Sequence, residues 1–236
     1  MTPARRNGKS TKEQKPAEDA AAKVDYAEMK RRREEEHRKA VERNMIAEAP
    51  VVEDLRRAGY RIDSLEEIIN SREVYRSAIP VLLKWLPIVA EIDIKLTIVQ
   101  ALTVRWAKRE AAKPLTEEFR KMVDLDYSYR WPIVSALEVM ADDSMFEDIA
   151  ELLRDKRHGR AREMLAMALG KMKKEPRAAD LAIELLDDEE VAGHALVAVR
   201  KLKATKARAK VEQFLNHPKA WVRAEARKAV AKFDKA

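Results

Sequence analysis

The chain has 236 residues, of which 46% are hydrophobic and 38% are charged, with only five glycines and no cysteine. The lack of cysteine excludes disulfides, cysteine zinc sites and thiolate nucleophiles, and the abundance of Ala, Leu, Glu, Lys and Arg favours helix along most of the chain. No apolar run approaches the ~18 residues of a membrane span, and the first residues lack the apolar centre of a secretory signal, so we expect a cytoplasmic protein without membrane association.

The net charge of +7 is unevenly distributed. Residues 157–236 contain 19 Lys and Arg against 11 Asp and Glu, whereas the preceding residues are close to neutral. A basic surface attracts nucleic acid, acidic proteins or anionic lipid. Because acidic residues are interspersed among the basic ones, we interpret most of this charge as the solvated outer face of helices.

In chain order, residues 1–16 form a polar tail that has nothing to bury and is predicted to be disordered. A charged helix follows over residues 17–49, with apolar residues too sparse for a coiled coil. We interpret it as a solvated arm, and an arm that folds on a partner is the alternative. Acid-before-base pairs four residues apart support the helix: Glu28/Arg32, Glu34/Arg38 and Glu35/Lys39.

From residue 50 to residue 236 the apolar pattern has the helical period and falls into pairs of helices. Gly59 is a plausible stop for the helix that precedes it. The predicted pairs are 77–89 with 92–108, 116–125 with 129–140, 145–154 with 160–172, 176–186 with 189–202, and 206–216 with 219–233. No strand pattern competes with this prediction.

A doublet of alanine followed by leucine or valine recurs late in the second helix of each pair, at spacings of 35, 32, 30 and 31 residues. A repeat of this length indicates a stack of similar supersecondary units. The doublet belongs to an apolar stripe, which each second helix is expected to bury against its neighbours. The doublets are Ala101-Leu102, Ala136-Leu137, Ala168-Leu169, Ala198-Val199 and Ala229-Val230.

Seven residues before the leucine or valine of the doublet, four of the five repeats carry a basic residue, and the fifth has Ala192 there. These residues are Lys95, Arg130, Arg162 and Arg223. With the Val222-Arg223 pair, the second helices resemble those of HEAT repeats over residues 77–236, most closely in the last three repeats. The resemblance implies an all-α, right-handed α-α solenoid, here preceded by the charged helix and the tail.

The resemblance also implies that an aspartate near the turn of a neighbouring repeat pairs with each of these basic residues. Asp124, Asp155 and Asp187 occupy comparable places. On that basis we interpret the basic row as a structural ion-pair ladder, and a basic strip for an anionic ligand is the alternative.

The last helix departs from the others, because Arg227 and Lys228 stand where earlier repeats are apolar, as a terminal cap requires. Trp221 stands where the other repeats are polar or charged. It is either a partner-binding anchor or a lid over the core of the last repeat. Gln100 and Ser135 share its helix face. The predicted partner-binding residues are Trp221, Met167, Lys171, His194, Lys201 and Lys228.

No catalytic residue, metal ligand or cofactor is predicted. The four histidines are scattered, and the acidic run from Asp187 to Glu190 is interpreted as a helix cap rather than a metal site. We therefore expect a non-catalytic scaffold that binds a protein partner through a concave face lined by second helices. Nucleic-acid binding through the basic C-terminal third is the alternative, and an enzyme similar to the helical-repeat DNA glycosylases is a distant third. The oligomeric state is left open.

Overall fold

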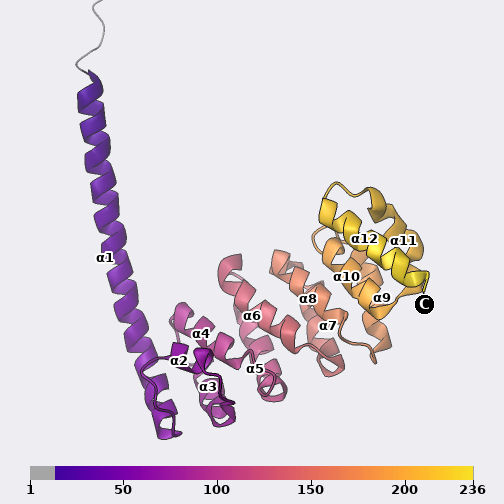
Figure 1. The fold of residues 1–236 in the computed structure, drawn as a ribbon, viewed down its shortest axis with the longest axis horizontal. Helices are drawn as coiled ribbons and strands as arrows, with labels where there is room; N and C mark the ends of the chain where they lie inside the picture. Colours follow the sequence, from indigo (N-terminus) through magenta and orange to yellow (C-terminus); the bar gives the residue numbers. More distant parts are fainter. Residues whose placement is uncertain (1–13, 236) are drawn as a thin grey trace, which may run out of the picture. The chain divides into compact units, whose positions relative to one another are not determined.

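The structure is a computed structural model that describes residues 14–235, with side chains for residue 26 and residues 28–235. Within these residues every regular element is a helix, so the all-α prediction is confirmed for them (Figure 1). The chain divides into two compact units, Met1–Ile46 and Ala47–Ala236. The predicted disordered tail lies outside the described residues, except for 14–16, which are helical. None of the described helices is long and apolar enough to cross a membrane.

Helix α1 (Gln14–Arg57) supplies the described part of the first unit and continues into the second. In the first unit, Glu28 pairs with Arg32 at 3.3 Å and Glu35 with Lys39 at 2.7 Å, as predicted. Glu34 lies 3.8 Å from Lys30 instead of pairing with Arg38. These are ion pairs of a solvated helix surface and contribute little to stability.

The helix does not stop before Pro50, as the sequence had suggested, but runs through this proline to Arg57. The loss of one amide donor at Pro50 is offset because Val51, Val52 and Leu55 bury their side chains in the core of the second unit. The predicted stop at Gly59 is confirmed, since Gly59 has φ +100°, and the amide of Tyr60 donates to the Leu55 carbonyl at 3.1 Å.

The rest of the second unit is a succession of helices joined by short loops and single 3-10 turns (Figure 1). The α-helices are α2 (Leu65–Asn70), α3 (Ile79–Trp85), α4 (Ile92–Leu102), α5 (Lys108–Lys121), α6 (Tyr127–Met140), α7 (Phe146–Arg154), α8 (Arg162–Leu169), α9 (Pro176–Glu184), α10 (Ala192–Leu202), α11 (Arg208–Gln213) and α12 (Ala220–Phe233). The 3-10 turns are η1 (Arg76–Ala78), η2 (Asp143–Met145), η3 (Lys156–Ala161), η4 (Leu185–Asp187), η5 (Thr205–Ala207) and η6 (Phe214–Asn216).

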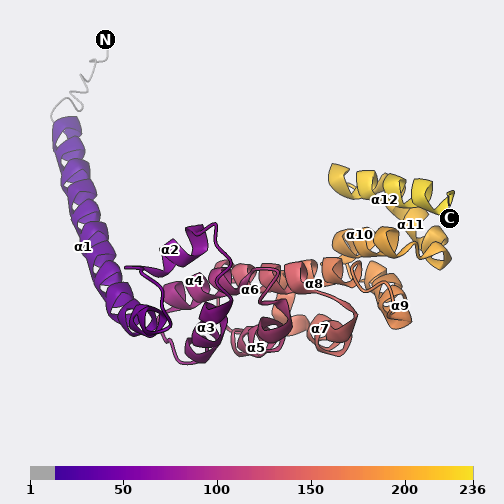
Figure 2. The same ribbon diagram turned by 60° about the horizontal axis from the view of Figure 1, so that its bottom comes forward.

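Contacts between helices follow the predicted pairing. The second helices α4, α6, α8, α10 and α12 contact one another in succession, and each also packs on the first helix of its own pair. In Figure 2, α4, α6, α8 and α10 form one row, and α3, α5, α7 and α9 form a second row beside it. The second helices run in the same direction, so equivalent residues of successive helices lie next to one another.

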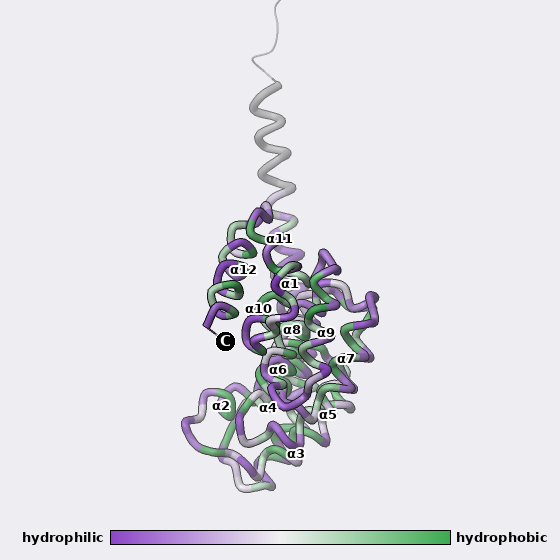
Figure 3. The backbone as a smooth tube through the Cα atoms, turned by 90° about the vertical axis from the view of Figure 1, so that its right-hand side faces the viewer, coloured by the Kyte–Doolittle hydropathy of each residue, from purple (hydrophilic) through white to green (hydrophobic). Residues whose placement is uncertain are grey.

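The core lies between these two rows and contains the recurring doublets. Nine of their ten residues are buried, and Val230 is half-buried. Hydrophobic and hydrophilic stretches alternate along the helices of this unit, as expected for helices that bury one face (Figure 3). Aligned alanines next to larger aliphatic side chains allow neighbouring second helices to pack closely.

One predicted pair of helix boundaries is wrong. The helix expected over residues 92–108 ends at Leu102, and the helix expected from residue 116 begins at Lys108. Thr103, with ψ 57°, leaves the helical conformation, and its hydroxyl donates to the carbonyl of Val99 at 2.7 Å. Arg105 therefore lies in the connection between α4 and α5 rather than on a helix. This explains why Arg105 is basic, whereas the other repeats have an apolar residue three positions after the leucine or valine of the doublet.

Candidate functional site

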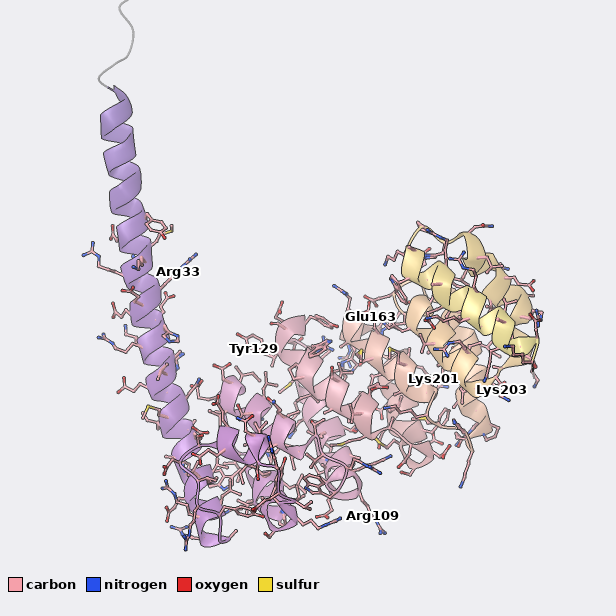
Figure 4. All side chains as sticks on the ribbon, viewed as in Figure 1. Arg33, Arg109, Tyr129, Glu163, Lys201 and Lys203 are labelled. Carbon is pink, nitrogen blue, oxygen red and sulfur yellow. The ribbon has the colours of Figure 1, made fainter. Side chains whose placement is uncertain are left out.

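The residues predicted to bind a partner lie on one side of the second helices. We call this surface the second-helix face and define it by Gln100, Ser135, Met167, Lys171, His194, Lys201, Trp221 and Lys228. Each of these residues is at least partly exposed. Tyr129 and Glu163 lie at the starts of α6 and α8, and Lys201 lies near the end of α10 (Figure 4).

A groove of about 430 Å³ lies between α4 and α6 on this face. Most of its wall is apolar, and Trp131 and Val139 are large hydrophobic residues that remain 48% and 54% exposed. The groove is lined by Leu96, Thr97, Val99 and Gln100 from α4, by its C-cap residue Thr103, and by Trp131, Pro132, Ser135, Ala136 and Val139 from α6. Exposed apolar side chains gathered in one concavity mark a binding surface more strongly than the same residues scattered singly.

The helical period places these side chains together. Trp131, Ser135 and Val139 are four residues apart and so share one side of α6, whereas Ile133 and Leu137 on the opposite side are fully buried. Small side chains at positions 135 and 136 leave room between the two helices. The groove is thus the outer surface of two helices whose inner surfaces form the core.

Two polar groups in the groove have no partner of their own. The hydroxyl of Ser135 is buried and makes no hydrogen bond within the described residues, and the same residues supply none to the Gln100 side chain. Thr97 and Thr103, by contrast, donate to carbonyls of their own helix, those of Asp93 and Val99. The serine hydroxyl and the glutamine amide are therefore the groups available to orient a bound segment.

Trp221 packs on the neighbouring helix α10 and is also exposed at the surface. Its ring centroid is 5.1 Å from that of His194, and a Cβ atom on Gly193 would lie only 2.9 Å from its Cζ2 atom. The indole therefore packs directly on α10, where only glycine leaves room. It nevertheless remains 44% exposed, so an additional role as an anchor stays a prediction.

The predicted lysines of this face differ in their surroundings. Lys171 donates to the carbonyls of Glu138 and Val139, at 2.5 and 3.3 Å, and so caps the end of α6, where a cation complements the helix dipole. Lys228 pairs with Glu225 at 2.7 Å, and Arg200 shares that carboxylate. Lys201 has no carboxylate partner among the described residues, and its stem packs beside Gly170.

The remaining two predicted residues contribute little charge. Met167 is half-buried on α8. Burial lowers the pKa of His194 and outweighs the opposite effect of Glu163, so the imidazole is neutral near pH 7. The positive charge of this face therefore comes from the lysines.

The four residues of the predicted basic row each have a structural partner, but the partners differ. Lys95 pairs with the buried Glu118 at 2.7 Å, and Arg223 donates to the carbonyls of His217 and Pro218 at 2.7 and 2.8 Å. Arg130 donates to the ring Nδ1 and the carbonyl of His158, at 2.8 and 3.1 Å.

Arg162 is the most enclosed member of the row. Its side chain is 2% exposed, pairs with Asp188 at 2.8 Å and with Glu190, and donates to the carbonyl of Leu153 at 3.2 Å. Lys95 and Arg162 therefore form ion pairs with neighbouring helices, whereas Arg130 and Arg223 donate to a histidine and to main-chain carbonyls, so the row is not a continuous ion-pair ladder.

None of the aspartates expected as partners forms an ion pair with this row among the described residues, although the charges of Asp124 and Asp155 oppose the lowering of the Arg130 pKa by burial. Asp155 instead accepts the amide of Arg157 at the start of η3 and pairs with the Arg157 side chain, and these interactions lower the Asp155 pKa to about 2. Asp187 pairs with Lys210, and among the described residues no ion pair joins Asp124 to the row. Because the Asp155 carboxylate caps η3 and pairs with Arg157, its hydrogen bonds are made there and not to an arginine of the row.

No protein-family model matches the chain, and no curated protein is significantly similar to it. Over residues 26 and 28–235, no three His, Asp or Glu side chains come together as metal ligands would. The second-helix face and its groove are therefore the features from which a function has to be inferred.

Proposed function

We propose that the chain is a non-catalytic scaffold of HEAT-like repeats, a right-handed solenoid that binds a protein partner through its second-helix face. Support comes from the succession of contacts among α4, α6, α8, α10 and α12, each backed by the first helix of its own pair. Stacks of this kind present an extended surface made of equivalent helix positions.

The observation that carries the proposal is the groove between α4 and α6. Trp131 is about half exposed on its wall, about two helical turns from Val139 and about one turn from a serine hydroxyl that has no partner among the described residues. Tryptophan is among the residues that dominate binding energy when a partner covers them. An apolar side chain of the partner would fill the groove, and its main chain would pair with Ser135 and Gln100.

Charge distinguishes the two ends of the face. The α4–α6 end is apolar, whereas Lys201 on α10 has no carboxylate partner within the described residues and Lys228 on α12 shares Glu225 with Arg200. A complementary partner segment would therefore carry an apolar anchor at one end and acidic residues at the other. Rim charges of this kind steer association and fix orientation more than they add affinity.

Nucleic acid is supported less well by the same residues. Several arginines of the basic C-terminal third are already held by carboxylates of the chain, including Arg162, Arg177, Arg200 and Arg208. Phosphate contacts need cations that are free to neutralise the backbone, and they give an affinity that falls steeply with salt. Binding of DNA or RNA with such a salt dependence, in place of a protein, would contradict the proposal.

A photo-crosslinking amino acid tests this function directly. Placed at Val139 inside the groove it should yield a protein adduct in the native cell lysate, and placed at Tyr129, an exposed position of α6 outside the groove, it should not. With the captured partner, Trp131→Ala should weaken binding at least about 30-fold, or about 2 kcal/mol, by calorimetry, whereas Tyr129→Ala should change it less than about threefold. Equal crosslinking at both positions, or an unchanged Kd in Trp131→Ala, would remove the groove from the interface.

A further inference from the structure

A second concavity, of about 520 Å³, has the opposite chemistry to the groove and shares no lining residue with it. We call it the basic pocket. Four of its nine lining residues are cations that come from η1, from the connection after α4 and from the start of α5, on which Arg109 is labelled in Figure 4. The pocket is lined by Arg76, Arg105, Lys108, Arg109, Trp106, Ala112, Asp142, Ser144 and Met145.

Three of the four cations have no carboxylate partner among the residues that the structure describes. Asp142 is the single carboxylate in the lining, and it lies 3.0 Å from Lys108. Burial raises the Asp142 pKa, but hydrogen bonds from Ser144 and Lys108 outweigh burial and lower it, so the carboxylate is ionised and committed to these partners. No carboxylate among the described residues pairs with Arg76, Arg105 or Arg109.

The start of α5 adds to the positive potential. The helix begins at Lys108, and its N-cap residue Ala107 offers no side-chain acceptor to the free amides. The positive end of the helix dipole therefore coincides with Lys108 and Arg109, and Glu110, which does not line the pocket, is the acidic residue of this first turn. Helix starts with free amides are common binding sites for phosphate groups.

Trp106 contributes an aromatic ring, held in place by its packing, to the lining of the pocket. Its ring packs edge-on against Tyr75 with centroids 5.3 Å apart, and Tyr75 in turn donates to the carbonyl of Ala101 at 2.9 Å. The indole Nε1–H is buried and finds no acceptor within the described residues. Buried donors are rarely left unpaired, because each costs free energy when it loses water without gaining a partner.

We propose that the basic pocket binds a small polyphosphate anion, such as the di- or triphosphate group of a metabolite. Arginine suits this ligand because its planar guanidinium donates two parallel hydrogen bonds to phosphate oxygens. Three unpaired arginines match a multiply charged group better than a single phosphate. The volume lies within the range of small-molecule sites. This site does not depend on the protein partner proposed above.

The test measures binding of inorganic tripolyphosphate to the full chain by calorimetry in ~50 mM salt. We expect one equivalent to bind, and Arg105→Ala/Arg109→Ala to weaken binding at least about tenfold. Both arginines are exposed, so the variant should remain folded, which its circular dichroism and melting temperature will verify. Lys173→Ala/Lys174→Ala is the matched control, because it removes the same charge from exposed positions outside the pocket and should stay within about twofold.

Three results would overturn the proposal. The first is no heat of binding at millimolar tripolyphosphate, and the second is an equal loss of affinity in both double variants, which would indicate non-specific attraction. The third is a single-stranded oligonucleotide that binds the chain, loses affinity in Arg105→Ala/Arg109→Ala, and is not displaced by tripolyphosphate, because the pocket would then serve a nucleic-acid backbone.

Discussion

Arg162 and His158 show how this chain buries polar side chains between neighbouring repeats. Arg162 is enclosed by Asp188, Glu190 and a main-chain carbonyl. His158 is stacked on Phe119 at 4.8 Å and accepts a hydrogen bond from Arg130. Both residues connect consecutive helix pairs, so each should contribute to the stability of the stack beyond its own pair.

Arg162→Ala should lower the free energy of unfolding by about 2–4 kcal/mol, because it leaves two carboxylates near the core without their cation. This expected loss of stability is smaller than that for a fully buried ion pair, because the Glu190 side chain remains 37% exposed. Urea denaturation followed by circular dichroism measures the change. Lys173→Ala, which removes an exposed charge, should stay within about 0.5 kcal/mol. Similar losses in the two variants would contradict the structural role of Arg162.

His158 should make stability depend on pH. Burial and, after it, the charge of Arg130 lower the pKa of His158 in the folded chain below its ordinary value of about 6.5. At a pH between the folded and the unfolded pKa, the unfolded chain therefore binds a proton that the folded chain does not. The stabilisation is complete above about pH 6.5 and is lost as the pH falls from there through the folded pKa.

The free energy of unfolding should therefore decrease from about pH 7 to about pH 5 in denaturant titrations. His158→Asn keeps an acceptor near Arg130 but does not titrate, so it should reduce this slope. The slope should not vanish, since His194 is shifted in the same direction. The same slope in both proteins would show that His158 does not cause the pH dependence.

Trp221 of α12 packs directly on Gly193 of α10. A Cβ atom on Gly193 would collide with the ring of Trp221 and lie 3.1 Å from a methyl group of Val222. In an ordinary helix, glycine is less stable than alanine by about 1 kcal/mol, so the preference for glycine here comes from the neighbouring helix.

Gly193→Ala should destabilise the chain by about 1–3 kcal/mol, because the added methyl displaces the indole. In a Trp221→Ala background the same substitution should cost at least about 1 kcal/mol less, since the ring is gone and the helix gains propensity. A double-mutant cycle in thermal or urea unfolding measures this coupling. Additive effects would mean that α12 is not positioned by this contact.

Helix pairing was predictable from the sequence because the recurring doublets reach the core in every repeat. The end of α4 was not predictable, because Val104, Trp106 and Ala107 continue an apolar pattern that the backbone leaves at Thr103. Val139, like Lys171 and Lys201, stands two residues after the leucine or valine of its doublet. Since those two lysines were assigned to the second-helix face, the sequence also indicated that Val139 belongs to it. Trp131 lay outside the positions assigned to the face and was missed.

The two proposed binding surfaces differ in how far the sequence could predict them. The groove joins two helices whose equivalent positions can be aligned, whereas the basic pocket collects residues from Arg76 to Met145 across three connections. No local sequence pattern links these residues. The uneven charge of the sequence indicated a basic surface in the C-terminal third instead. Only packing in three dimensions brings the unpaired arginines together.

Each main contact of the second unit joins helices that are neighbours or next neighbours in the chain. The spacing between the apolar groove and the lysines of α10 and α12 is consequently set by the number of repeats between them. Duplicating one segment of about 32 residues, cut at equivalent doublets, would lengthen that spacing by one interhelical distance, roughly 8–10 Å, and leave both ends intact. The length of the stack, and with it the spacing between the proposed binding residues at its two ends, can therefore change in fixed steps.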